Sequence, residues 1–125
     1  MKTFSNHQPA TIEKVGDGTH YYNYGIKQTE RPREDEQEPA QEFEYQSVRI
    51  YGELTAENIL KAVLRDRRTE AEEIDLLNRY NSFTLGISED EADKEDYENY
   101  LVEIRETRGM VQSDLEDHNE GGGQQ

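Results

Sequence analysis

The chain has 125 residues and a formal net charge of -15, from 29 acidic and 14 basic residues, and only 31% of it is apolar. Because an average globular domain is roughly 45–50% apolar, we expect one domain with a small core that gains from a partner or from self-association. The negative charge argues against nucleic acid and anionic membrane surfaces as partners, and the lack of cysteine excludes disulfides and thiolate chemistry.

The sequence also argues against a membrane partner on grounds of hydropathy. It contains no apolar run near the roughly 18 residues that a membrane span requires. Its first residues, 1–7, lack the apolar stretch of a signal peptide. We therefore expect synthesis in the cytoplasm and no membrane partner.

An arm and a β-hairpin are predicted at the N-terminus. Residues 1–9 are polar and end at a proline, which is typical of an arm that becomes ordered on a partner. Residues 10–28 predict a hairpin, because the two glycines that flank Asp17 supply the positive φ of a tight turn. In the returning strand, 19–27, period two places three apolar residues on one face. These residues are Tyr22, Tyr24 and Ile26.

A second strand is predicted after an acidic stretch. Residues 29–41 combine acidic residues with two prolines and have no large apolar side chain, so they predict a solvated loop. Strand character returns over residues 42–52, where the alternation changes phase near Gln46. This change indicates either a bulge or a strand that is covered on both faces. We expect the strands over 19–27 and 42–52 to pair antiparallel.

Residues 55–114 predict three helices. Thr55 can cap the first, whose apolar stripe has helical spacing. A Thr-to-Glu capping box at 69–72 begins the second, Gly86 lies just beyond its end, and a similar box at 88–91 begins the third. The positions expected to be buried are Ile59, Leu60, Val63 and Leu64 in the first helix, Ile74, Leu77 and Tyr80 in the second, and Tyr97, Tyr100, Leu101, Ile104 and Val111 in the third.

Together these elements predict an α+β domain, in which a short antiparallel β-hairpin sheet of two or three strands packs on a three-helix segment. The domain covers residues 10–113 and includes the acidic loop. Because the second and third helices are joined by a short connection, we expect them to pack as an antiparallel pair. Residues 114–125 are charged and then rich in Gly and Gln, which predicts a disordered tail.

No group of residues has the pattern of a catalytic, cofactor-binding or metal site. The acids between Glu89 and Glu98 lack the central glycine of a calcium loop, and they are typical of a negatively charged first helical turn. His7, His20 and His118 are scattered, and no two of them have the spacing of a helical metal site. We therefore predict a protein without enzymatic activity, cofactor or bound metal.

Aromatic side chains are concentrated in the predicted sheet, and both faces of the strand over 19–27 carry them. One face can cover the helices, whereas the other would be exposed or bound. Tyrosine suits an interface because it combines a large ring with a polar tip. Burial of both sheet faces within the monomer and a platform for carbohydrate are the alternatives. The candidate interface tyrosines are Tyr21, Tyr22, Tyr24, Tyr45 and Tyr51.

One basic cluster lies at the end of the first predicted helix. It consists of Arg65, Arg67 and Arg68, around Asp66. Cations at this position complement the helix dipole and the unpaired carbonyls of the last turn. The alternative is a docking patch, which could pair with an acidic segment of a neighbouring copy, and these three arginines complete the candidate interface.

Five short segments carry a resemblance to a known group of proteins. They are YYNYGIK at 21–27, YQSVRIYG at 45–52, AVLRDR at 62–67, LLNRYNSF at 76–83 and YENYL at 97–101. Over roughly residues 20–112, the chain resembles small uncharacterised proteins encoded among the tail or structural genes of Bacteroides-type phages and prophages. The resemblance implies a virion-associated or tail-associated structural protein, or an assembly factor for one, with no catalytic residues to carry over.

The leading hypothesis is therefore a non-enzymatic phage structural or accessory protein. It would be made in the bacterial cytoplasm, associate with the virion, and contact other virion or tail proteins or further copies of itself. The charge of -15 favours a second hypothesis, an acidic regulatory module such as an inhibitor or DNA mimic that acts on a host protein. A third, a small enzyme or metal-dependent hydrolase built on the carboxylates, has no motif behind it.

Overall fold

The computed structural model describes residues 1–31 and 40–122. Within these residues the chain forms one antiparallel sheet of four strands and three helices, which confirms the predicted α+β class. In the order in which they lie in the sheet, the strands are β1 (Lys2–Ser5), β4 (Ala40–Ile50), β3 (His20–Arg31) and β2 (Ile12–Lys14). The helices are α1 (Ala56–Arg67), α2 (Glu70–Thr84) and α3 (Glu91–Gly122).

The sheet is larger than the predicted hairpin because the N-terminal residues join it. Residues 1–9 were expected to form an arm, but β1 pairs antiparallel with β4, with Lys2 opposite Gln46 and Ser5 opposite Phe43. The backbone groups of β4 that face away from β3 need hydrogen-bonding partners, and β1 supplies them. Its four residues alternate too weakly in hydropathy to signal a strand in the sequence.

Two further predictions are corrected at the ends of elements. The acidic loop predicted over 29–41 is shorter, because β3 continues to Arg31 and β4 begins at Ala40; residues 32–39 lie outside the described part of the chain. The tail predicted as disordered over 114–125 is helical as far as Gly122, where α3 ends, and residues 123–125 also lie outside it. Charged residues on a long helix stay in solvent while the backbone bonds continue, so composition alone misjudged this segment.

The predicted irregularity of the sheet lies beside Gln46, as expected, but β3 rather than β4 carries the extra residue. The pairing of β3 with β4 shifts register between Tyr24 and Lys27, and Gly25 has φ 63°. A glycine in this left-handed region accommodates the extra residue of a β-bulge at no steric cost. Because the bulge reverses the alternation, Ile26 does not share a face with Tyr24 as period two predicted.

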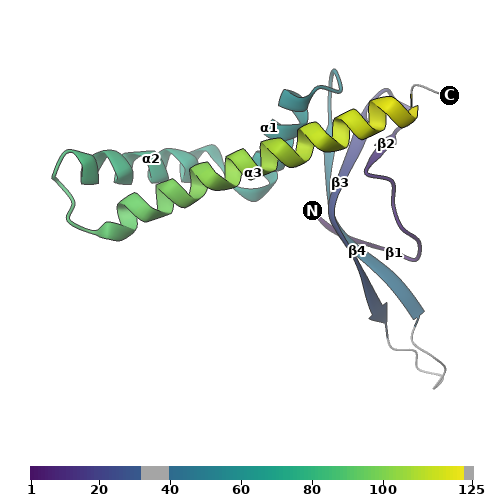
Figure 1. Ribbon diagram of the computed structural model, residues 1–125, viewed down its shortest axis with the longest axis horizontal. Coiled ribbons are helices and arrows are strands. Elements are labelled where there is room, and N and C mark those ends of the chain that lie inside the picture. The colour runs from purple at the N-terminus through teal and green to yellow at the C-terminus, as the bar shows by residue number, and fades with distance from the viewer. Residues whose placement is uncertain (32–39, 123–125) are drawn as a thin grey trace.

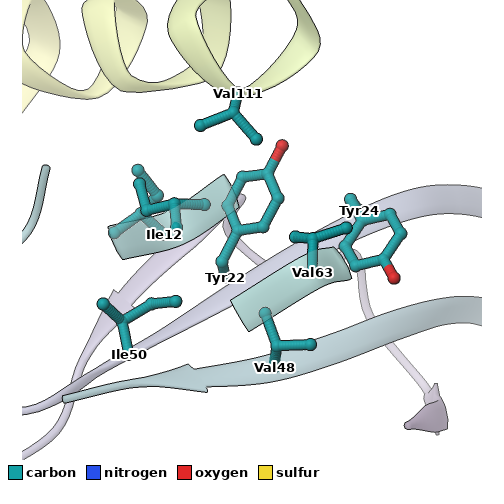
Figure 2. Close-up of a cluster of buried hydrophobic side chains, with 8 residues drawn as sticks. Ile12, Tyr22, Tyr24, Val48, Ile50, Val63 and Val111 are labelled. Carbon is teal, nitrogen blue, oxygen red and sulfur yellow. The ribbon is translucent and has the colours of Figure 1, made fainter. Parts of the chain in front are cut away.

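The hydrophobic core lies between one face of the sheet and two helices. Figure 2 shows the ring of Tyr22 between the strands and the helix that carries Val111, with its hydroxyl pointing toward that helix. The Tyr22 hydroxyl donates a 2.5 Å hydrogen bond to Asp114 of α3, so the ring's polar tip is satisfied inside the protein. The core side chains are Ile12, Tyr22, Tyr24, Val48, Ile50, Ile59, Val63 and Val111.

The first helix forms as its sequence predicts. The Thr55 side chain accepts a hydrogen bond from the backbone N–H of Asn58 and so caps α1. Ile59, Leu60 and Val63 are buried at helical spacing, and α1 packs against β4. This confirms three of the four expected core positions, and Leu64 is half-buried.

Beyond this core, α2 and the first half of α3 form a projecting helical hairpin. Figure 1 shows the two helices side by side as they run away from the sheet, while the second half of α3 crosses it. We call α2 and α3 as far as Ile104 the arm; this helical arm is distinct from the N-terminal arm that was predicted over residues 1–9. We call the sheet, α1 and the rest of α3 the body. At 1.5 Å per residue the 32 residues of α3 span about 48 Å, which is long enough to belong to both.

The arm confirms the expected antiparallel pair but corrects the face by which α2 packs. Ile74 and Leu77 of α2 and Leu101 of α3 were expected to be buried, yet they are 56%, 41% and 47% exposed. The rings of Tyr80 and Tyr97 pack at a tilt across the helices with centroids 4.8 Å apart, and the Tyr100 hydroxyl donates to Glu73. The face that meets α3 thus runs through Glu73 and Tyr80, because tyrosine rings and a paired carboxylate fill this contact.

The ends of the arm helices follow local signals. The capping box of Thr69 and Glu72 is present, and Gly86, with φ 77°, lies just beyond α2 as predicted. At the start of α3, Asp90 accepts from the N–H of Ala92 in place of the expected box at 88–91.

Within the described residues, no helix has both the length and the apolar character to cross a membrane.

Candidate functional site

The two faces of the sheet differ in what covers them. The core and the helices lie against one face, which we call the inner face. The opposite or outer face carries the alternate residues of β3 and β4, where Tyr21 pairs with Arg49 and Asn23 pairs with Ser47. No core side chain of the described residues belongs to this face. It is therefore the part of the sheet available for contact with another molecule.

The outer face contains a hollow of about 310 Å³. Asn23 is 2% exposed there, and its amide donates to the carbonyl of Ala10 at 2.8 Å and to the carboxylate of Glu13 at 3.1 Å. These bonds tie the chain that enters β2 to the face of β3, so the hollow has fixed walls. Its lining residues are Met1, Thr3, Glu13, Tyr21, Asn23, Tyr45 and Ser47.

Next to the hollow, Arg49 lies between two tyrosine rings. Its guanidinium carbon is 5.5 Å from the centroid of Tyr21 and 5.6 Å from that of Tyr51. Cations over aromatic faces are attracted by the ring quadrupole. We call these three residues the aromatic shelf; Tyr51, at its end, is 70% exposed.

The aromatic shelf is held in place by the hairpin turn between β2 and β3. Arg49 donates to the carboxylate of Asp17 at 2.5 Å and to the hydroxyl of Thr19 at 3.0 Å. The hydroxyl of Thr19 in turn donates to Asp17 at 2.7 Å. These hydrogen bonds from Thr19, followed by the charge of Arg49, lower the pKa of Asp17. The carboxylate therefore stays ionised and continues to orient Arg49.

No family model, curated protein or solved structure matches the chain.

The candidate tyrosines fall into two groups. Tyr22 and Tyr24 lie in the core on the inner face and are not available to a partner. Burial is the main cause that raises the pKa of the Tyr22 and Tyr24 hydroxyls, and the hydrogen bond to Asp114 raises the pKa of Tyr22 further. Both hydroxyls therefore remain neutral. Tyr21, Tyr45 and Tyr51 belong to the outer face or its rim, where the structure brings them together.

Two of the candidate arginines, Arg67 and Arg68, join the end of α1 to α3. Arg67 donates to Thr107 at 2.8 Å and lies over the ring of Tyr24, with 5.4 Å from guanidinium carbon to centroid. Arg68 pairs with Glu103 at 2.6 Å. These contacts favour the structural alternative for both residues, because they connect the end of α1 to α3.

Arg65 has a contact on each side of α1. It pairs with Glu73 of α2 at 2.5 Å. It also lines a second hollow, of about 500 Å³, which borders the aromatic shelf. Of the three arginines in the candidate interface, Arg65 is the one that the structure places beside the outer-face tyrosines.

The sequence reasoning missed Arg49, Asn23 and Asp17. A signal for Arg49 was present, because period two along the strand places Arg49 on the same face as Tyr51. Nothing in the sequence indicates that Asp17 and Asn23 position this face, since both act through long-range contacts. Within the described chain, no cluster of three or more possible ligands could hold a metal ion. The arrangement offers shape, aromatic surface and fixed charge for binding.

Proposed function

We propose that this protein is a non-enzymatic structural or accessory component of a phage particle or tail, made in the bacterial cytoplasm, and that it binds another virion protein through the outer face of its sheet. The observation that carries this proposal is the aromatic shelf of Tyr21, Arg49 and Tyr51 beside the hollow. The resemblance of five segments to proteins from phage structural gene regions supports the choice of partner class.

The composition of the outer face favours protein recognition. Tyrosine and arginine are enriched among the residues that contribute most to protein–protein affinity. The aromatic shelf is also preorganised, because Asp17 and Thr19 already hold Arg49 in place. A partner that stacks on Tyr51 would lose little side-chain entropy at this position, which increases affinity.

Co-sedimentation with phage particles tests the proposal. The wild-type chain should co-sediment with particles from the producing strain, and Tyr51→Ser should weaken this binding about 10-fold or more, the loss typical of an exposed aromatic anchor. Phe4→Ser is the matched control, because Phe4 is also a half-exposed aromatic ring but lies on the other face, opposite Glu44. A wild-type chain that never sediments with particles would contradict the proposal.

The acidic regulatory module is retained as a second candidate because one flank of the arm concentrates negative charge. Asp75, Asp93 and Asp96 surround the single cation Arg79, at 3.1 to 3.3 Å. A host protein with a basic surface would bind such a flank rapidly and with strong salt dependence. Binding that falls steeply with salt but ignores Tyr51→Ser would favour this function over the first.

A further inference from the structure

The arm exposes apolar side chains on both of its helices. Ile74 and Leu77 of α2 are exposed, and Leu101 and Val102 of α3 are 47% and 54% exposed. No residue of α2 is buried, although the helix has a complete capping box. A helix that is well capped but leaves an apolar face uncovered is typical of an element that packs against a second molecule.

Three of these side chains share one flank of the arm. The bond from Tyr100 to Glu73 fixes how the antiparallel helices are aligned along their axes. Leu101 and Ile74 each follow one of these residues, so they lie within about 3 Å of each other along the arm axis. Arg79 contacts Asp96 across the other flank, at 3.1 Å. At 3.6 residues per turn, Leu77 lies about 160° around α2 from Arg79, and Leu101 lies about 140° around α3 from Asp96. Both leucines therefore lie on the flank opposite the Arg79–Asp96 pair. We call Ile74, Leu77 and Leu101 the apolar flank.

The border of the apolar flank carries charges of both signs, unlike the acidic flank around Arg79. Lys94 and Glu98, which precede Leu101 by about two turns and one turn respectively, pair with each other at 3.9 Å. Arg105 follows Leu101 by one turn, is exposed, and forms no ion pair within the described residues. Glu70, one turn before Ile74, is 81% exposed at its side chain and has a long ion pair with Arg65, at 4.0 Å.

A mixed border is what a symmetric contact requires. A two-fold axis places a surface patch against the same patch of a second copy, so a border of one sign would repel itself. On the apolar flank, Lys94 and Arg105 can instead meet Glu98 and Glu70 of a second copy. The charge pattern of this flank is therefore compatible with a symmetric contact.

We propose that the apolar flank is a contact between two copies of this chain, which pack their arms side by side as a four-helix bundle around Ile74, Leu77 and Leu101. Antiparallel helices with apolar positions at this spacing pack in this way in helical bundles. The contact would give α2 the buried side chains that it lacks in the monomer. It does not depend on the outer sheet face or on the function proposed for that face.

Salt distinguishes a second copy from the other possible occupant, a basic partner. Each copy carries a formal charge of -15, so two copies repel at long range, and salt screens that repulsion. Self-association through the apolar flank should therefore strengthen as salt increases. Binding of a lysine-rich or arginine-rich partner to the arm would weaken under the same conditions.

Analytical ultracentrifugation of the full chain tests the proposal over a range of protein and salt concentrations. The wild type should show a monomer–dimer equilibrium that shifts toward dimer at high salt. Leu101→Glu should weaken the dimer about 100-fold or more, because the contact would bury a charge from each copy. Phe4→Glu adds the same charge at a half-exposed apolar residue of the body and should leave the equilibrium nearly unchanged.

A cross-linking experiment locates the contact. The chain has no cysteine, so a single introduced thiol reports on its own surroundings alone. Leu101→Cys should form a covalent dimer under mild oxidation, whereas Lys61→Cys, on the exposed surface of α1, should not. A wild-type chain that stays monomeric at high protein and salt concentrations, or a dimer that is unaffected by Leu101→Glu, would overturn the proposal.

Discussion

The body and the arm of this protein are stabilised by different means. In the body, side chains from β2, β3, β4, α1 and α3 bury each other in one core. In the arm, α2 has no buried residue and is held by its capping box, by the contact between the rings of Tyr80 and Tyr97, and by ion pairs. A short chain with 31% apolar residues can fill one core, and the body contains it.

The region that should determine stability therefore differs from the region whose apolar helix face is exposed. Burial of apolar area is the dominant favourable term in folding, so the body should determine the free energy of unfolding. Ion pairs on an exposed helix contribute little, typically below about 1 kcal/mol each. The arm should therefore open locally at a lower free energy than the body unfolds.

The largest expected effect is in the body. Ile59 is fully buried beneath the sheet, so Ile59→Ala leaves a cavity and should lower the free energy of unfolding by about 3 kcal/mol. Urea denaturation followed by circular dichroism measures this change. A loss below about 1 kcal/mol would contradict the contrast between body and arm, because it would mean that the core of the body is not the source of stability.

A smaller effect is expected where the core meets α3. Tyr22→Phe removes the hydroxyl that donates to Asp114 and leaves this carboxylate without its partner from the sheet. The free energy of unfolding should fall by about 1 to 2 kcal/mol. Urea denaturation at neutral pH gives the value, and Tyr21→Phe, on the outer face, is the matched control that should leave it nearly unchanged.

Alkaline pH probes the packing of the two arm helices against each other. Burial and then the bond to Glu73 raise the pKa of Tyr100 to about 12, from its ordinary value of 10.0. Because the folded chain holds this proton more tightly, the stability that it contributes is present below pH 10 and is lost as pH rises from about 10 to about 12. Thermal melting of Tyr100→Phe across this range should show a shallower decline than the wild type.

The smallest effect is expected on the apolar flank. Ile74→Ala removes an exposed side chain, so the free energy of unfolding of the monomer should change by less than about 0.5 kcal/mol. The same denaturation experiment, at a protein concentration too low for association, measures it. A loss comparable to that of Ile59→Ala would show that the arm is buried within the monomer and would remove the contrast between the two regions.

Local signals in the sequence were sufficient for α1, for α2 and for part of the sheet. Thr55 and the Thr69–Glu72 box cap their helices because the hydrogen bonds involved span three residues. For the candidate site, the sequence identified Tyr21, Tyr45 and Tyr51 by their residue type and their place in strands. It could not separate them from Tyr22 and Tyr24, because both groups alternate on strands and burial depends on which face the helices cover.

The sequence by itself determined the α+β class, the three helices and the lack of a recognisable catalytic motif, since these follow from period, capping residues and composition. The tertiary structure alone decided that β1 completes the sheet, that Asp17 orients Arg49, and that α2 turns Ile74 to solvent. Each of these outcomes depends on contacts between residues far apart in the chain, such as the pairing of Lys2 with Gln46. Local hydropathy cannot encode such contacts, because it does not specify which surfaces meet.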